Sequence, residues 1–256
     1  MFKAIRITIL LFILFFVAVS TWLSQARSTD WNNSLWVKIY PVNADGSESS
    51  AQYITGLNSE DFGPIESFIA REAARYGRSL ARPVRVELGQ QITEQPPEIK
   101  DGSGVFGIML WSLKLRWWAS GTAGEQDAIK PDVRIFVRYH HPDDEFVLDN
   151  SVGMQKGMVS VVNAYAGHHY QGSNNVIIAH EFLHTLGATD KYNPANGLPL
   201  APDGLAEPER KPLYPQRYAE IMGGRIAIAE HDAIVPKGLK YALIGPLTAS
   251  EIKLIE

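Results

Sequence analysis

The sequence predicts an α/β fold, with a mixed, twisted, mainly parallel sheet, helices on its faces and one antiparallel edge strand. Strand-like and helix-like segments alternate along most of the chain, which is typical of parallel sheets with helical cover. The last two strand-like segments have no helix between them, which predicts that the later one is the antiparallel edge. Apolar residues make up 45% of the 256 residues and charged residues 20%, as in globular rather than disordered proteins.

Four segments have the composition of β-strands. Residues 34–42 and 132–140 carry apolar side chains at alternate positions, so one face of each strand is expected to be buried. Residues 83–89 form a shorter strand of the same kind. Residues 156–166 form the last strand, which we expect at the antiparallel edge.

Two segments in the first half of the chain are predicted to be helices. In residues 59–77 apolar side chains recur at helical spacing, between Ser59 as the cap and Gly77 as the terminator. Residues 105–121 fit both a strand and a helix, and their length favours the helix. The prolines and glycines of residues 93–104 predict a loop between these segments and the strands around them.

The last quarter of the chain is predicted to be mostly irregular. Residues 194–215 contain six prolines, which predicts a connection without regular structure. Residues 247–256 are expected to close the chain as a short helix capped by Thr248 or Ser250.

The N-terminus has the features of a membrane segment. Residues 7–23 are an unbroken apolar run, long enough for a span and longer than most signal-peptide cores. Lys3 and Arg6 precede the run, so the N-terminus is expected in the cytoplasm and the rest of the chain on the periplasmic or extracellular side. We expect a single-pass signal-anchor in the cell membrane; the alternative is a cleaved signal peptide, which leaves a secreted protein.

These features divide the chain into a signal-anchor or signal peptide (residues 1–27), a linker (28–33) and one domain (34–256). The net charge of −4 is too small to favour nucleic acid as a partner. The absence of cysteine excludes both a disulfide framework and a cysteine-ligated zinc site. The sequence leaves the oligomeric state open.

The segment AHEFLHTLGATD contains two histidines four residues apart, His180 and His184. Such residues share one helix face, so both imidazoles can reach a single ion at about 2.0–2.1 Å. Glu181 follows the first histidine and is placed to act as general base on a water held by the ion. Apolar neighbours predict a buried helix, in which these polar groups need compensating partners.

Asp190 is the candidate third ligand. In an uninterrupted helix it would lie about 9 Å beyond His184 and be rotated by about 240° around the axis. Gly187 permits the left-handed conformation that ends helices, so the chain can turn back and bring Asp190 to the ion. Three protein ligands leave one position for water, which is the arrangement of catalytic zinc sites.

The motif HEFLHTLGATD resembles the zinc signature of the metzincin peptidases, HExxHxxGxxH, in the form with Asp in the last position. It is similar to the HExxHxxGxPDxY of snapalysin-like and immune-inhibitor-A-like peptidases. Metzincins also have a methionine in a tight turn below the zinc, and AEIMGGRI supplies Met222 before two glycines. The resemblance implies a metzincin-like fold for residues 34–256, with a buried zinc helix, a Met-turn and a C-terminal helix.

The resemblance also implies an activity, that of a zinc metalloendopeptidase with one catalytic zinc ion. Glu181 would move a proton from the attacking water to the leaving amine. The substrate, a peptide or protein, is expected to pair as an extended strand with residues 156–166. Met222 would support the site from below, and Tyr192 and Tyr218 are candidate hydrogen-bond donors to the oxyanion.

Other functions remain open at this point. The chain could be another zinc hydrolase, or a membrane-tethered binding or scaffold module with a vestigial zinc site. A gluzincin arrangement with Glu207 or Glu209 as third ligand is disfavoured, because Pro208 and Pro212 prevent a helix there. The substrate, the cleavage preference and the regulation stay open, as does the role of five further histidines: His140, His141, His168, His169 and His231.

Overall fold

The computed structural model describes residues 6–8, 11, 12, 15, 29–99, 104–122, 130–142, 151–154 and 157–255. Within these residues, no helix combines the length and the apolar character needed to cross a membrane. The predicted membrane segment, residues 7–23, lies for the most part outside the described residues. The signal-anchor and the division into residues 1–27, 28–33 and 34–256 therefore stay predictions.

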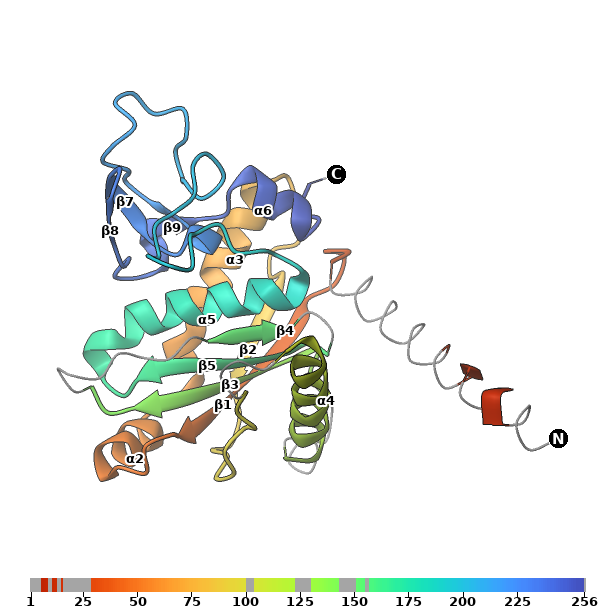
Figure 1. Cartoon of the computed structure of the whole chain (residues 1–256). Helices are drawn as coiled ribbons and strands as arrows, with labels where there is room; N and C mark the ends of the chain where they lie inside the picture. The colour runs from red at the N-terminus through yellow and green to blue at the C-terminus, as the bar shows by residue number, and fades with distance from the viewer. Residues whose placement is uncertain are drawn as a thin grey trace.

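A five-stranded sheet forms the centre of the fold, in the order β2-β1-β3-β5-β4 (Figure 1). Four of its strands are parallel to one another: β1 (Leu35–Asn43), β2 (Val84–Leu88), β3 (Val133–His140) and β5 (Val159–Tyr165). The fifth, β4 (Val152–Met154), pairs antiparallel with β5 at one edge. The predicted α/β class, with a mainly parallel sheet and an antiparallel edge, is confirmed.

The prediction of residues 156–166 as the edge strand is wrong. This segment contains β5, which lies inside the sheet and is parallel to β3. The edge is β4, whose three residues are too few to show the alternation that identifies strands. Because β4 precedes β5 in the chain, the chain reaches the edge of the sheet first and then turns back to the interior position.

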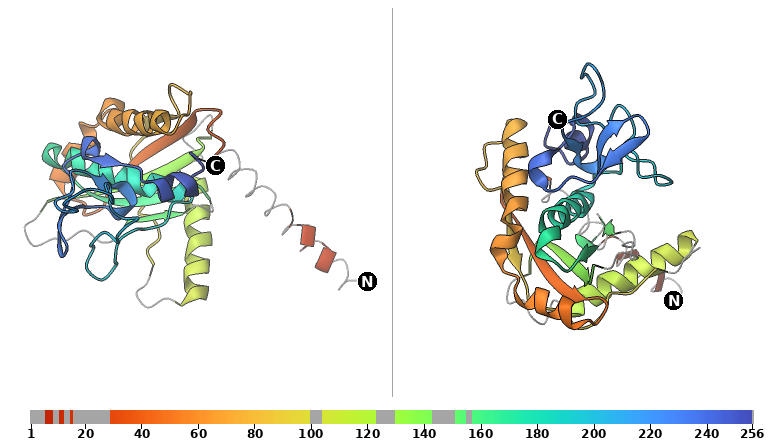
Figure 2. Two further views of the ribbon diagram at one scale, coloured as in Figure 1. Left: turned by 90° about the horizontal axis from the view of Figure 1, so that it is seen from above. Right: turned by 90° about the vertical axis from the view of Figure 1, so that its left-hand side faces the viewer.

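Helices cover both faces of the sheet. Alternate residues of β1, β3 and β5 form one large core with α3 (Gly63–Arg75) and α5 (Gln171–Leu186). The residues between them, including Tyr40 and Phe136, point to the other face and pack against α4 (Val105–Thr122). Figure 2 shows α4 apart from α3 and α5. The predicted helix at residues 105–121 is confirmed as α4.

The predicted helix at residues 59–77 is present but begins differently. It consists of a short 3-10 helix, η1 (Ser59–Phe62), followed by α3. Asn58 caps η1, because its side chain accepts a hydrogen bond from the backbone N–H of Glu60 at 2.8 Å. The prediction of Ser59 as the cap is wrong, since its hydroxyl accepts instead from the backbone N–H of Leu88 at 3.1 Å.

A helix before η1, α2 (Glu48–Thr55), was not predicted from the sequence. It has two apolar buried residues, Tyr53 and Ile54, in a mostly polar segment, so helical periodicity is weak. Ser47 caps it by accepting a hydrogen bond from the backbone N–H of Ser50 at 3.1 Å.

The chain after α5 lies on the side of that helix away from the main sheet (Figure 1). Its proline-rich part, residues 194–215, contains no helix or strand, as predicted. The regular elements follow it: β6 (Ala219–Glu220) with β9 (Ala242–Leu243), β7 (Ile226–Ala229) with β8 (Asp232–Ile234), η3 (Ile221–Gly223), η4 (Leu239–Tyr241) and α6 (Pro246–Glu251).

The closing helix α6 begins at Pro246, one residue before the predicted segment 247–256, and ends earlier than predicted, at Glu251. Gly245 is its N-cap residue and Pro246 its first residue, a position that suits the fixed φ of proline. The prediction of Thr248 or Ser250 as the cap is therefore wrong. The hydroxyl of Thr248 instead donates to Glu220 at 2.7 Å.

Candidate metal centre

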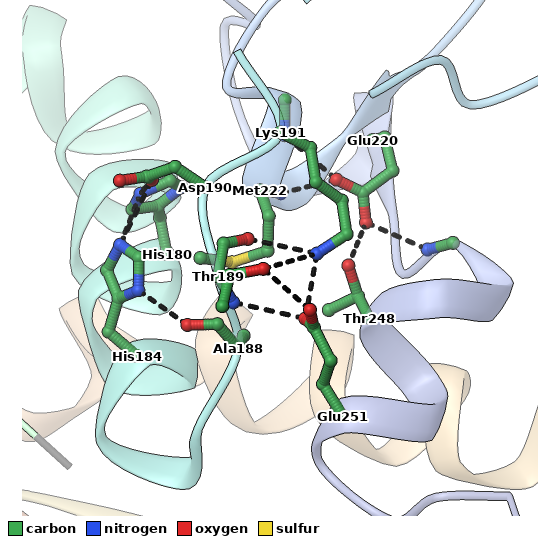
Figure 3. Close-up of polar contacts among 12 residues, drawn as sticks. His180, His184, Ala188, Thr189, Asp190, Lys191, Glu220, Met222, Thr248 and Glu251 are labelled. Carbon is green, nitrogen blue, oxygen red and sulfur yellow. Dashed lines mark hydrogen bonds and ion pairs between the residues drawn. The ribbon is translucent and has the colours of Figure 1, made fainter. Parts of the chain in front are cut away.

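Helix α5 carries the motif and ends where the sequence predicts. Gly187 is its C-cap residue, with a left-handed φ of 109°, and its N–H donates to the carbonyl of His184 at 3.1 Å. A side chain at this φ would be strained, so glycine is the residue that lets the chain leave the helix here. The chain then reverses toward the helix and brings Asp190 alongside it (Figure 3).

Three side-chain atoms converge at this place. The Nε2 atoms of His180 and His184 lie 3.1 Å apart. The Oδ1 atom of Asp190 is 3.1 Å from each of them. The three atoms therefore form a triangle of nearly equal sides. Figure 3 shows the three side chains lying together.

The hydrogen bond made by Nδ1, the second ring nitrogen, determines which nitrogen of each imidazole carries the proton. Nδ1 of His180 donates to the carbonyl of Ile221 at 2.9 Å, and Nδ1 of His184 donates to the carbonyl of Ala188 at 2.8 Å. A carbonyl oxygen accepts only, so in each neutral imidazole the proton is on Nδ1 and Nε2 carries a lone pair. Two imidazole lone pairs and one carboxylate oxygen thus face one another.

This arrangement fits a metal ion. Ligands at about 2.0–2.1 Å from a tetrahedral zinc ion lie about 3.3–3.4 Å apart, and the three separations here are within a few tenths of that. The backbone carbonyls that hold both Nδ1 atoms are the usual outer partners of metal-binding histidines. His180, His184 and Asp190 together offer three ligand-type atoms, and a carboxylate oxygen of Glu181 lies within 4.8 Å of the histidine atoms.

The contacts within the triangle shift the pKa values of two of its groups. Burial opposes the charged form of His184, but the hydrogen bond to Asp190 and the charge of Glu181 outweigh it and raise the pKa of that imidazole. Burial also acts to raise the pKa of Asp190, yet the two imidazoles hold it well below its usual range. Both shifts indicate that the site favours a positive charge at its centre.

Glu181 lies beside the triangle and is not part of it. Its side chain is buried, and its Oε2 atom has no hydrogen-bond partner within the described part of the chain. One ligand-type atom of Glu181 lies within 4.8 Å of those of His180 and His184. Burial raises the pKa of Glu181, and the two histidines oppose that shift. A carboxylate with a free oxygen and a raised pKa is suited to accepting a proton.

Met222 lies beneath the site in the turn η3 and is fully buried. The turn touches two parts of the candidate site, because its Ile221 carbonyl holds His180 and its Met222 carbonyl accepts from the backbone N–H of Lys191 at 2.9 Å. Glu220 fixes the turn by accepting from the backbone N–H of Met222 at 2.7 Å. Met222 therefore lies next to the candidate site, and its supporting role stays a prediction.

The two tyrosines differ in their relation to the site. The ring of Tyr192 lies 6.2 Å from that of His180, and burial, with the charge of Asp190, raises the pKa of its phenol. Tyr192 therefore stays protonated and can donate a hydrogen bond at the site. Tyr218 is exposed, and the guanidinium of Arg217 lies 5.9 Å from its ring centre. The structure brings only Tyr192 of the two to His180.

The remaining sequence candidates lie elsewhere. The carboxylate of Glu207 pairs with Arg217, and Glu209 follows it in the irregular segment, so the gluzincin arrangement finds no support. His140 is hydrogen-bonded to Asn163, His141 to Ser49, and His168 packs against Tyr53. His169 packs against Tyr170, and His231 is exposed between β7 and β8.

Gly153 was missed as a site residue. A Cβ atom there would lie 2.6 Å from the carbonyl oxygen of Glu181 and 2.6 Å from Cβ of His184. The edge strand β4 therefore approaches the zinc-helix candidate so closely that only glycine fits at its centre. Its neighbours do not identify the position in the sequence, because the contact joins residues about 30 positions apart.

Comparisons with known proteins add no family. No family model matches the chain, and no curated protein matches it. One similar solved structure is described as a chaperone–substrate complex, with 15% identity over 86% of this chain and 34% of that chain, and a TM-score of 0.42. Another is catalytically inactive OgpA from Akkermansia muciniphila in complex with an O-glycopeptide substrate, with 12% identity over 85% of this chain and 58% of that one, and a TM-score of 0.36. The chain thus spans about a third to just over half of these proteins, and the function proposed below rests on neither of them.

Proposed function

We propose that the chain is a zinc-dependent endopeptidase in which His180, His184 and Asp190 hold the ion and Glu181 is the general base. The observation that carries the proposal is the triangle of three acceptor atoms 3.1 Å apart, with an unpartnered carboxylate oxygen beside it. Acceptors that face one another repel unless a cation lies between them. The absence of cysteine and the mix of imidazole and carboxylate ligands favour zinc in a catalytic arrangement.

The chemistry follows from what each group can do. When bound, the ion would polarise the attacking water and the scissile carbonyl. Glu181 accepts the proton of the water on its carboxylate and then delivers it to the leaving amine. The raised pKa of Glu181 suits both halves of this transfer, because the acid form must persist until the amine departs. Tyr192, beside His180, is the better placed of the two tyrosines to donate to the oxyanion.

The edge strand β4 supports a peptide as the substrate. Its Gly153 lies against Glu181 and His184, so an extended chain added to this edge would run past the proposed reacting groups. Such strand addition uses backbone hydrogen bonds, which suit a protein substrate of variable sequence. The substrate strand is therefore assigned to β4 rather than to residues 156–166.

Replacing Gly153 with alanine is expected to damage both stability and activity. The new Cβ would overlap the backbone of Glu181, so either β4 or α5 must shift. We expect a loss of about 1–3 kcal/mol in the free energy of unfolding. A displaced edge strand misplaces the substrate, and we expect kcat/KM to fall on the order of 10- to 100-fold. Denaturant unfolding and peptide-cleavage kinetics measure the two effects.

Gly63→Ala is the matched control for this substitution. A Cβ atom at Gly63 meets nothing within 4 Å, and its φ of −52° is ordinary for alanine. This variant should keep wild-type stability and activity. Wild-type activity in Gly153→Ala would show that β4 does not bind the substrate.

Zinc content and peptide cleavage, measured together on the full chain, test the proposed function. We expect about one zinc ion per chain and cleavage of some members of a mixed library of quenched peptides. A chain that binds zinc but cleaves nothing would instead support a binding or scaffold module with a vestigial site. Export of the domain by an N-terminal anchor is part of the same proposal. Access of an added protease to the C-terminus of the protein, compared between intact cells and spheroplasts, tests it.

A further inference from the structure

The two residues that flank Asp190 are both bound to one carboxylate. The hydroxyl of Thr189 donates to Oε1 of Glu251 at 2.6 Å, and its backbone N–H donates to Oε2 at 3.0 Å. The ammonium of Lys191 donates to the same Oε2 at 2.7 Å (Figure 3). Glu251 thus holds the chain on each side of the proposed third ligand, from 60 residues away.

The side chain of Lys191 is only 3% exposed, which is unusual for a lysine. A buried ammonium is costly unless charge and hydrogen bonds compensate it. Here Glu251 supplies the charge, and the carbonyl of Thr189 accepts a further hydrogen bond at 2.9 Å. Lys191 therefore closes a ring of contacts through Thr189 and Glu251, directly beside Asp190.

The backbone of Lys191 is fixed as well. Its N–H donates to the carbonyl of Met222 at 2.9 Å, and its carbonyl accepts from the N–H of Leu200 at 2.8 Å. In contrast, the described polar contacts of the Asp190 carboxylate are those to His180 and His184. The position of Asp190 therefore depends on the residues on either side of it.

Glu251 is itself held in place, because it is the last residue of α6. The start of that helix is bound by the buried Glu220, which accepts from the N–H of Gly245 at 2.9 Å and from the hydroxyl of Thr248. The other oxygen of Glu220 accepts from the N–H of Met222. Helix α6 thus connects the turn beneath the site to the loop that carries Asp190.

We propose that Glu251 is a positioning residue that sets the place of Asp190, so that the metal affinity of the site depends on the docked C-terminal helix. The inference rests on the proposed function, in which Asp190 is a ligand. The imidazoles of His180 and His184 need no such positioning residue, because helix α5 itself sets their positions. Asp190 lies in a loop outside any helix, and ordering a loop costs conformational entropy. If the loop is ordered before the ion binds, metal binding does not carry that entropy cost.

A purely structural brace would have a different consequence. Its loss would lower the stability of the fold and leave the zinc affinity of the folded chain unchanged. A positioning residue, in contrast, changes the affinity itself, as partners outside the ligand shell usually do by 10- to 100-fold. The zinc dissociation constant of the folded chain therefore separates the two roles.

The test compares Glu251→Gln, Thr189→Val and Thr189→Ser with wild type, in the full chain, by competition for zinc with a chelator. We expect the dissociation constant to rise about tenfold in Glu251→Gln and in Thr189→Val, which lose contacts to the loop. Thr189→Ser keeps the hydroxyl and should stay close to wild type. Thermal unfolding of the metal-free variants reports stability separately.

Glu66→Gln is the matched control. Glu66 accepts from Arg82 and from the backbone N–H of Val86 at 2.6 Å, as Glu251 does from Lys191 and Thr189. The two carboxylate side chains are also equally exposed, at 21% and 20%. Glu66 lies on α3, away from the site, so its variant should lose stability without losing zinc affinity.

The outcomes are distinct. Unchanged zinc affinity in both Glu251→Gln and Thr189→Val would overturn the positioning role while leaving the peptidase proposal intact. An equal loss of affinity in Glu66→Gln would also overturn it, because the effect would then be a general one of stability. A wild-type chain that binds no zinc would remove the proposed function and this inference together. If Glu251→Gln does not fold, the pair Thr189→Val and Thr189→Ser decides.

Discussion

Glu181→Gln is expected to lose peptide cleavage while keeping its metal. The amide has the shape of the carboxylate but cannot take up the proton of the attacking water, so the rate should fall by about 10²–10⁴-fold or more. The three proposed ligand atoms belong to other residues, and the zinc content should stay near that of wild type. Cleavage of a quenched peptide and zinc analysis of the same sample measure both quantities.

Glu66→Gln serves as the control here as well, because it makes the same chemical change on another helix and should retain activity. The unfolding temperature of Glu181→Gln shows whether the substitution affects the fold itself. Glu181 is buried with an oxygen that has no partner, so the neutral amide should not destabilise the fold strongly. If Glu181→Gln cleaves peptides as fast as wild type, another group is the base and the proposed mechanism is wrong.

The part of the candidate site that can be predicted from the sequence is the part made by neighbouring residues. His180, His184, Gly187 and Asp190 lie within eleven positions, so helix geometry and one glycine are enough to predict that these residues can meet. The mainly parallel sheet follows in the same way from the alternation of strands and helices.

The groups that the sequence did not reveal act across long separations. Glu251 meets Thr189 from 62 positions away, and Gly153 meets Glu181 across the sheet edge. Neither has a local pattern, because a glutamate at a helix end and a glycine in a loop-like segment are ordinary residues. Only the tertiary fold gives them their contacts.

The misassigned edge strand has the same cause. The alternation in residues 156–166 identifies a strand but says nothing about its partners. The position of β5 inside the sheet is decided by β4, which is too short to be detected and whose central residue is the glycine packed against α5. A prediction of sheet order from strands alone fails wherever such a short strand adds an edge.

Asp190→Ala is expected to lose the metal itself. The variant leaves two imidazoles on one helix face, and two ligands hold zinc much less firmly than three. Substitution of residues outside the ligand shell already costs about 10- to 100-fold in affinity, so removal of a ligand should raise the zinc dissociation constant on the order of 100-fold or more. Activity should fall with zinc occupancy and recover in part when zinc is added in excess.

Asp203→Ala is the matched control for this variant, because Asp203 is an exposed aspartate further along the same connection and has no part in the site. It should bind zinc as wild type does. Asp190→Glu offers a second comparison, since it keeps the charge but lengthens the side chain in a loop whose flanking residues, Thr189 and Lys191, are both bound to Glu251. We expect it to bind zinc more weakly than wild type and more tightly than Asp190→Ala. Full zinc occupancy in Asp190→Ala would show that another group closes the site, and the resemblance of the motif to a three-ligand peptidase signature would then be misleading.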